Sequence, residues 1–249
     1  MIKNNRLYLL KNNSMAIFSY AFMNFQTDII NFIINLISIS FYIVIFATIL
    51  NKQVTNYLQF LLPGLIIINL LSAISYQALK IWSLGSTSKL MSYWLSLPHS
   101  LNFLLLTFSF MAIFSSLMYT LPIILVIIYL HFTINFPLWI LLIFSSSLFL
   151  FYINFVLVLY FFKTNSFVIV FNVSQPLLLR ISPVFYPLIY LPIFALPLSY
   201  LNPVTWIVES LRGGFNLIIV ITFLIFLDSI CYKILLNYWK KKIQNGELV

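Results

Sequence analysis

Long, uninterrupted apolar runs dominate the pattern of hydrophobic and polar positions along this chain. A helix needs roughly 20 apolar residues to cross about 30 Å of hydrocarbon. Six stretches meet that requirement: Ile29–Leu50, Tyr57–Leu79, Leu101–Leu130, Leu138–Phe162, Ser166–Tyr190 and Phe215–Asn237. Their apolar residues are continuous rather than alternating, which favours helices over barrel strands. The pattern therefore predicts an all-α polytopic membrane protein whose six spans form one transmembrane domain over residues 29–237.

Residues 1–28 are predicted to form a cytoplasmic, interfacial amphipathic helix. Between Asn5 and Gln26, Leu and Phe residues mix with Asn, Ser, Lys and Arg, as in a helix that lies in the interface plane. A poorly ordered tail is the alternative. The apolar stretch between Arg6 and Lys11 is too short for a signal-peptide core, so we expect the chain to remain uncleaved. Residues 238–249 are predicted to be a cytoplasmic basic tail.

A second special segment lies in the loop Lys80–Ser100, between the second and third runs. Leu90, Met91, Trp94 and Leu95 recur at helical spacing and are followed by Pro98. This spacing predicts a short cytoplasmic helix over residues 83–98. Its apolar face would be directed at the membrane boundary or at a partner. A passive surface helix is the alternative interpretation.

The third special segment is rich in proline. Pro183–Pro203 contains five of the ten prolines of the chain, and proline at that density prevents a continuous helix. No charged residue occurs from Ile181 to Val208, so the segment is too apolar for a free aqueous loop. A re-entrant extracellular hairpin over residues 183–205, between the fifth and sixth helices, reconciles these two facts if protein shields its backbone.

Composition and charge narrow the class of protein. The chain has 249 residues, of which 63% are hydrophobic and 7% charged, whereas soluble domains contain about 45–50% and about 25%. A soluble enzyme, a nucleic-acid-binding domain and a disordered chain are therefore excluded. The net charge of +9 is interpreted as topological, because Lys and Arg mark the cytoplasmic side of a membrane. With both termini cytoplasmic, ten of the thirteen cations lie inside, and three lie outside: Lys52, Arg180 and Arg212.

A search for catalytic chemistry finds no candidate. The five glycines do not form a phosphate-binding G-x-x-x-x-G-K-[ST] loop. Cys231 and the two histidines, His99 and His131, are too scattered to form a metal site. The four acidic residues are also widely separated, so they provide no paired carboxylates for a metal. We expect a protein that is not an enzyme and that carries no cofactor or metal of its own.

Two charged residues fall at membrane depth. A charged side chain is energetically costly there, so each is a candidate for a functional role. Asp228 lies inside the sixth run, and Arg180 lies late in the fifth. Arg180 is expected to extend to the outer boundary of the membrane, and the alternative is an ion pair with Asp228 or Glu209. Glu209 and Arg212 lie three residues apart and are expected to pair locally on a short helix.

Three motifs resemble those of type-2 ABC transporter permeases. Tyr57–Gly64 is similar to the family's "Y-x-x-F-L-x-P-G" motif, and Leu95–Ser100 resembles the end of its coupling segment. The most specific match resembles the signature "S-x-x-F-x-P … L-P … N-P-x-T … R" before the last helix. It comprises Ser182–Pro187, Leu191-Pro192 and Asn202–Thr205, followed by Glu209 and Arg212. The order, the spacing and the six-span layout agree across nearly the whole chain.

The resemblance implies the transmembrane subunit of an ATP-driven exporter in the plasma membrane. A second permease copy or a homologue would complete the pathway, and two partner ATPase subunits would bind ATP and Mg. It implies a hydrophobic or amphipathic substrate: a drug, a lipid, a lipid-linked glycan or a peptide. The coupling residues would be Gly85, Leu90, Met91, Trp94, Leu95 and Pro98. The extracellular gate would comprise Pro183, Phe185, Tyr186, Pro187, Pro192, Asn202 and Pro203.

Two other classes of function stay open at this point. A secondary transporter or channel that works without an ATPase predicts clustered ionisable residues at mid-bilayer and internal repeats. Asp228 and Arg180 are the only such residues, and no clear repeat is present. A structural assembly factor is the third possibility. The sequence does not identify the substrate, the direction of transport or whether the partner permease is identical.

Overall fold

The computed structural model describes residues 29–30, 32–34, 36–45, 57–86, 100–130, 135–160 and 166–245. This part of the chain is all-helical and contains no β-strand, which confirms the predicted class of fold. A short apolar helix, Phe32–Ile45, comes first. The elements that follow are α2 (Tyr57–Ser86), α4 (Leu101–Tyr129), α5 (Phe136–Tyr160), α6 (Ser166–Ile181), the 3-10 turn η1 (Leu188–Tyr190), α7 (Leu196–Leu201), α8 (Pro203–Leu211) and α9 (Leu217–Gln244).

Four of these helices are long and apolar enough to cross a membrane: α2, α4, α5 and α9. They correspond to the second, third, fourth and sixth predicted spans. The helix Phe32–Ile45 is shorter, and α6 has 16 residues, equivalent to about 24 Å at 1.5 Å per residue. Four spans therefore have the required length, and a count of six stays a prediction.

Three predicted boundaries differ from those of the structure. The fifth run was expected to continue to Tyr190, but α6 ends at Ile181, because a residue that precedes proline, here Ser182, is disfavoured in the α conformation. The helix α2 continues to Ser86, so Gly85 lies in its last turn rather than in a loop. The helix α9 continues to Gln244 and includes the first lysines of the predicted basic tail.

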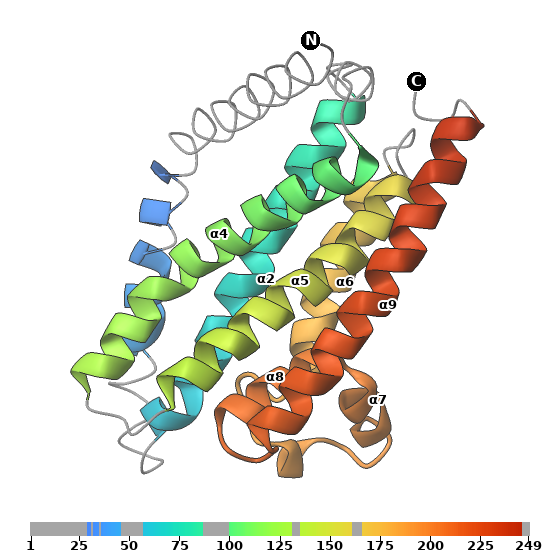
Figure 1. Cartoon of the computed structure of the whole chain (residues 1–249). Helices are drawn as coiled ribbons and strands as arrows, with labels where there is room; N and C mark the ends of the chain where they lie inside the picture. Colours follow the sequence, from blue (N-terminus) through green and yellow to red (C-terminus); the bar gives the residue numbers. More distant parts are fainter. Residues whose placement is uncertain are drawn as a thin grey trace.

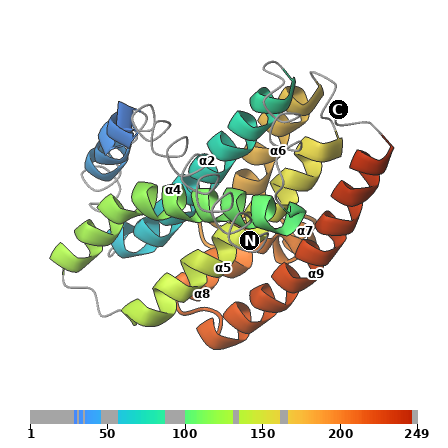
Figure 2. The same ribbon diagram turned by 45° about the horizontal axis from the view of Figure 1, so that its top comes forward.

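The long helices lie side by side, with α2 in the interior (Figure 1). It packs against α4 and α5, whereas α9 packs mainly against α5. In the most apolar 18-residue stretch of each helix, 72% of the residues of α2 are buried, against 17% of those of α9. Turning the molecule separates α6 and α9 onto different sides of the bundle (Figure 2). The outer faces of α4 and α9 expose large hydrophobic residues, as expected for surfaces that contact lipid.

Small polar residues join α4 to α5. The hydroxyls of Ser116 and Ser147 lie 2.7 Å apart in a buried contact between these helices. Because each hydroxyl has a single proton, one of the two donates to the other, while its partner donates to a carbonyl of its own helix, that of Ile113 for Ser116 or of Ile143 for Ser147. Serine at helix contacts lets two backbones approach closely and satisfies its own polar group inside a membrane.

One end of the bundle is covered by the segment that connects α6 to α9, residues 182–216, which we call the connecting segment. It contains η1, α7 and α8, and its short helices lie beyond the ends of the long ones (Figure 1). Pro203 occupies the first turn of α8, and the side chain of Asn202 caps that helix by accepting from the amide of Val204 at 3.0 Å. This segment is broken, as its prolines predicted.

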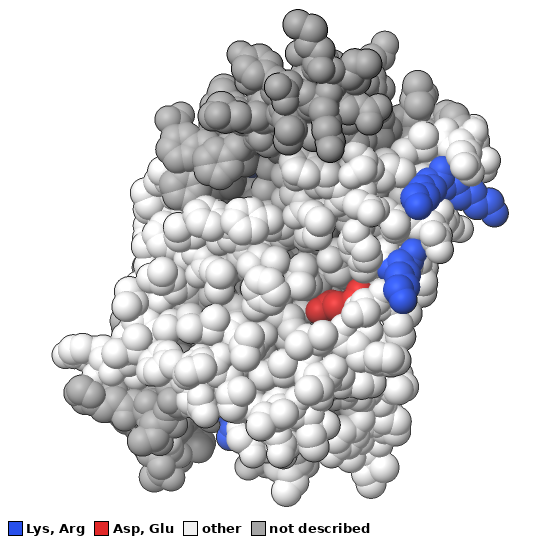
Figure 3. All heavy atoms as spheres, in the orientation of Figure 1, with Lys and Arg blue, Asp and Glu red and all other residues white. Residues whose placement is uncertain are grey.

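On one face of the molecule, the described residues include few charged side chains. The face drawn in Figure 3 is almost entirely uncharged, and its Lys, Arg, Asp and Glu atoms gather mainly over α9. That helix contains Asp228, Lys233, Lys240 and Lys241. The distribution agrees with a wide apolar belt and with basic residues near one end of the bundle.

Candidate functional site: the Arg212 junction

The connecting segment begins by packing closely against the first turns of α2. Pro183 and Val184 are buried, and a Cβ atom at Gly64 would lie 2.5 Å from the carbonyl oxygen of Val184. No side chain fits at such a distance, so the approach requires glycine at position 64. The hydroxyl of Tyr57 also donates to the carbonyl of Phe185 at 3.0 Å. The turn after α6 is therefore fixed to the start of α2.

Arg212, directly after α8, joins three parts of the chain. Its Nε donates to the carbonyl of Phe60 in α2 at 3.0 Å, and Nη2 donates to that of Val184 at 2.8 Å. Its Nη1 donates to the carbonyl of Pro183 and to Glu209 Oε1, the latter at 3.2 Å. The guanidinium carbon lies 3.5 Å from the centre of the Phe60 ring, a cation–π contact. We call this cluster the Arg212 junction.

The charge of Arg212 is largely removed from solvent. Its side chain is 9% exposed, and burial lowers its pKa to about 10, while Glu209 opposes that change. Arg212 therefore keeps its charge at neutral pH. The predicted local pair with Glu209 is confirmed. Such a pair stabilises a protein only where further hydrogen bonds satisfy the buried charges, and the three carbonyls provide these for Arg212.

A turn of two glycines places this ion pair. Gly213 has a φ of 83°, in the region that favours glycine. A Cβ atom at Gly214 would lie 2.7 Å from Glu209 Oε2, and the amide of Gly214 donates to the carbonyl of Glu209 at 2.8 Å. The chain thus turns around Glu209 before α9 begins, and the side chain of Asn216 caps that helix.

A second set of contacts holds the other end of the connecting segment. The side-chain amide of Asn202 donates to the carbonyl of Leu178 in α6 at 2.7 Å. The hydroxyls of Ser199 and Thr205 lie 3.2 Å apart and are buried. The indole nitrogen of Trp206 donates to the carbonyl of Tyr200 at 2.6 Å. These bonds tie α7 and α8 to each other and to α6.

The predicted gate residues divide into three groups. Pro183, Phe185 and Tyr186 lie in the turn after α6, where the Tyr186 hydroxyl donates to the carbonyl of Arg180 and burial raises its pKa. Asn202 and Pro203 begin α8. Pro187 and Pro192 lie between these two sites, and Pro192 is exposed. The structure therefore places Pro183 in the Arg212 junction and Phe185 beside it, through its bond with Tyr57, but it does not bring Pro192 to the junction.

The predicted coupling residues are described only in part. Gly85 belongs to the last turn of α2. Leu90, Met91, Trp94, Leu95 and Pro98 lie outside the described residues, as does the predicted N-terminal helix over residues 1–28.

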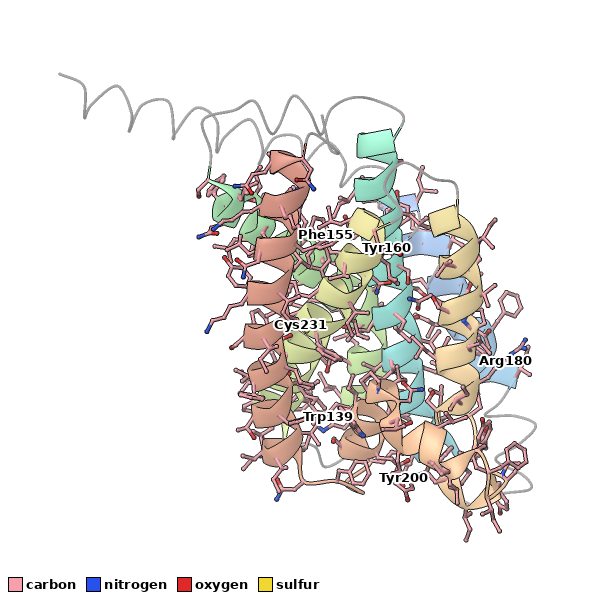
Figure 4. All side chains as sticks on the ribbon, turned by 90° about the vertical axis from the view of Figure 1, so that its right-hand side faces the viewer. Trp139, Phe155, Tyr160, Arg180, Tyr200 and Cys231 are labelled. Atoms are coloured by element: carbon pink, nitrogen blue, oxygen red, sulfur yellow. The ribbon has the colours of Figure 1, made fainter. Side chains whose placement is uncertain are left out.

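The two predicted intramembrane charges do not meet. Arg180 is exposed and points away from the bundle on the α6 side, whereas Cys231 on α9 lies on the other side (Figure 4). Asp228, three residues before Cys231, is 8% exposed, and neither of its carboxyl oxygens has a hydrogen-bond partner within the part of the chain that the structure describes. Glu209 pairs with Arg212 instead of Arg180. The alternative in which Arg180 pairs with an acidic residue is therefore wrong among the described residues.

A mainly apolar groove with a few uncharged polar groups lies between α2 and α6. It has a volume of about 240 Å³ and is lined by Leu71, Ser72, Ser75, Asn172, Gln175, Pro176 and Leu179. Among the described residues, the buried Ser75 hydroxyl has no partner, and the Gln175 side-chain amide donates to Asn154 of α5 at 3.4 Å.

The central position of Arg212 was missed by the sequence analysis. The spacing of Glu209 and Arg212 predicted their pairing, but it carried no information about Phe60, which is 152 residues away in the chain. One feature of the sequence could have indicated a special role for this pair. Glu209 and Arg212 follow a long stretch without any charged residue and come directly before two glycines.

The long apolar helices fit an integral membrane protein of the all-helical class. Within the part of the chain that the structure describes, no group of three His, Cys, Asp or Glu residues could hold a metal ion. Comparison with protein families, with curated proteins and with solved structures finds no match to this chain.

Proposed function

We propose that this chain is the permease subunit of an ATP-driven ABC exporter in the plasma membrane, with six spans and both termini cytoplasmic. One observation supports the proposal most strongly. Residues of Tyr57–Gly64 and of Ser182–Pro187, which resemble the family's motifs, contact each other and Arg212, the last residue of the third motif, at or beside the Arg212 junction. Motifs that are far apart in the sequence are expected to meet in space if they form one functional site.

The geometry of α2 suggests how the work of ATP would reach this junction. The helix has 30 residues and is therefore about 45 Å long at 1.5 Å per residue. It begins at the junction, and its last residues, Gly85 and Ser86, are the first residues of the proposed coupling segment, Gly85–Pro98. When the two partner ATPases close on ATP and Mg, a displacement of that segment would move α2 as a rigid body. The connecting segment would move with it and open the outer side of the pathway.

The substrate of the proposed exporter is hydrophobic or amphipathic. The groove between α2 and α6 offers uncharged polar groups beside Leu71, Pro176 and Leu179, which suits a molecule with both kinds of surface. A drug, a lipid, a lipid-linked glycan and a peptide all meet this description. A second permease copy or a homologue would close the other side of the pathway.

Purification in mild detergent tests the proposal directly. We expect an ATPase subunit to co-purify with the chain in near-equal amount, and we expect the complex to hydrolyse ATP. If the chain purifies alone and transports in liposomes without ATP, the proposal is wrong. The genes adjacent to that of this chain give an independent check, since an ATPase gene is expected there.

A charged residue in the coupling segment should separate hydrolysis from transport. Trp94→Asp or Leu95→Asp would place a charge on the face that is proposed to contact the ATPase. We expect the ATPase to remain bound and active while transport falls, because the force no longer reaches the membrane helices. Unchanged transport by both variants, measured beside the wild-type complex, would remove the coupling role from this segment.

A secondary transporter is the second candidate, and Asp228 favours it. A buried carboxyl group without a partner is expensive inside a membrane and often belongs to an ion or proton site. Asp228→Asn separates the two candidates. A secondary transporter should lose transport in this variant, whereas an ATP-driven exporter should keep it within about twofold, since the energy comes from ATP rather than from a coupled ion.

A further inference from the structure

The first part of the connecting segment, residues 182–205, has two fixed ends and a middle with few contacts. The first end, Ser182–Tyr186, is held at the Arg212 junction. The second end, from Ser199 to Thr205, is held by Asn202 and by the contact between Ser199 and Thr205. Residues 187–198 lie between these ends, and we call them the strap.

The strap forms hydrogen bonds almost entirely within itself. Its amides at Tyr190, Leu191, Ala195 and Leu196 donate to carbonyls at most four residues earlier in the chain. Within the described part of the chain, no hydrogen bond joins a strap residue to α2, α4, α5 or α9. Its large side chains are also turned outward, with Ile189 84% and Ile193 86% exposed. A segment with few buried contacts opens locally at low free energy.

The first end differs from the strap because a side chain from a later part of the chain, that of Arg212, also holds it. Two of the four acceptors of Arg212 are the carbonyls of Pro183 and Val184, and a third is the carbonyl of Phe60. A planar guanidinium directs its donors in fixed directions, which a lysine ammonium does not. Removing it would leave buried carbonyls with fewer partners and would free the turn from α2.

We infer that Arg212 is a positioning residue that makes Ser182–Tyr186 move as one body with the start of α2, and that the strap is the part of the connecting segment that changes conformation. The inference rests on the proposed function for its role in transport, since it assigns the moving part of the proposed gate. The division into a fixed first end and a strap that changes conformation concerns only this chain and does not depend on the proposed function. Tyr200, in α7 shortly after the strap, lies at the end of the bundle that the connecting segment covers (Figure 4).

Amide hydrogen exchange of the full chain in lipid nanodiscs tests the division. In the wild type, the segment Val184–Tyr186 should exchange at least about tenfold more slowly than Ile193–Phe194, because Val184 is buried and its amide donates to the carbonyl of Ser182, whereas Ile193 and Phe194 are exposed. Arg212→Gln should raise exchange at Val184–Tyr186 about tenfold and leave the strap unchanged. Arg212→Lys should give an intermediate value, because it keeps the charge but loses the planar donors.

Arg180→Gln is the matched control. It makes the same chemical change in the same region, but the Arg180 side chain is exposed, and its backbone carbonyl still accepts from Tyr186. We expect its exchange pattern to equal that of the wild type. Equal exchange at Val184–Tyr186 in the wild type and in Arg212→Gln would overturn the inference, as would a strap that is as protected as the first end. If Arg212→Gln fails to fold, Glu209→Gln provides the weaker perturbation of the same site.

A second measurement distinguishes positioning from a merely structural role. In the complex with its ATPase, exchange is compared without nucleotide and with ATP and vanadate. The wild type should change only in the strap, and Arg212→Gln should change at Val184–Tyr186 as well. A merely structural Arg212 would raise exchange equally in both states, which would overturn the role in movement. If no ATPase binds, the proposed function fails, while the nanodisc experiment still decides the division.

Discussion

Single residues at the start of α2 determine how closely the connecting segment can approach. Gly64 leaves room for the carbonyl of Val184, and Phe60 presents both its ring and its carbonyl to Arg212. The sequence marked Gly64 only as part of a motif. Its physical role depends on a backbone 120 residues away in the chain, which no local pattern describes.

Gly64→Ala is predicted to destabilise the protein. The new methyl group would lie 2.5 Å from the Val184 oxygen, so the turn must move away from α2. Overpacking of this kind costs about 1–3 kcal/mol of unfolding free energy. Thermal unfolding in detergent measures the effect, with Ser72→Ala as the control on the exposed side of the same helix. That control should stay within about 0.5 kcal/mol of the wild type, and a similar result for Gly64→Ala would contradict the close approach.

Asn202 and Asn216 allow a comparison between two helix caps. Both side chains accept from amides at the start of a helix, but only Asn202 also donates to a carbonyl of α6. Asn216→Ala should cost about 1 kcal/mol, the usual value for a lost cap. Asn202→Ala should cost about 1 kcal/mol more, because a buried hydrogen bond is lost as well. Equal losses of unfolding free energy would show that the contact with Leu178 contributes nothing.

At the scale of the elements, packing within the bundle depends on small polar residues rather than on hydrophobicity. Lipid tails are as apolar as Leu, so helices gain little by hiding apolar side chains from them. The contact between Ser116 and Ser147 joins α4 to α5 where both backbones approach closely. The apolar pattern predicted that these helices exist, because continuous runs are sufficient for that. It could not predict which faces meet, since all faces are apolar.

A double-mutant cycle measures this contact. Ser116→Ala, Ser147→Ala and the double variant should give a coupling energy of about 0.6 kcal/mol, the average for hydrogen bonds between membrane helices. The value should be small because either hydroxyl can donate its single proton to a carbonyl of its own helix instead of to the other hydroxyl. Ser229→Ala combined with Ser116→Ala is the control pair, since Ser229 is exposed on α9, and its coupling energy should be zero. Zero coupling for the first pair would show that the two hydroxyls act independently.

At the scale of the whole molecule, the sequence located the long helices well and their ends less well. Hydrophobic runs continue past the last helical turn, so the run from Ser166 suggested a helix that would end at Tyr190. Pro183 and the buried contacts of Val184 end it at Ile181 instead. The Arg212 junction needed the fold itself, because Arg212 and its acceptors come from three separate parts of the chain. The composition was sufficient to predict a membrane protein. The Arg212 junction could be identified only from residues that come together in the folded structure.

The shortness of α6 has a consequence for the surrounding lipid. Its 16 residues extend over about 24 Å, against about 38 Å for the 25-residue spans, whereas the hydrocarbon layer is about 30 Å thick. If α6 crosses the membrane, as proposed, lipid beside it must thin, because even an upright helix of this length is shorter than the hydrocarbon layer. The four longer spans must tilt further in a thinner bilayer. Reconstitution into bilayers with progressively shorter acyl chains should therefore raise the thermal unfolding midpoint only until this added tilt outweighs the relief at α6. A host membrane of uneven thickness would thus favour this protein in regions somewhat thinner than average.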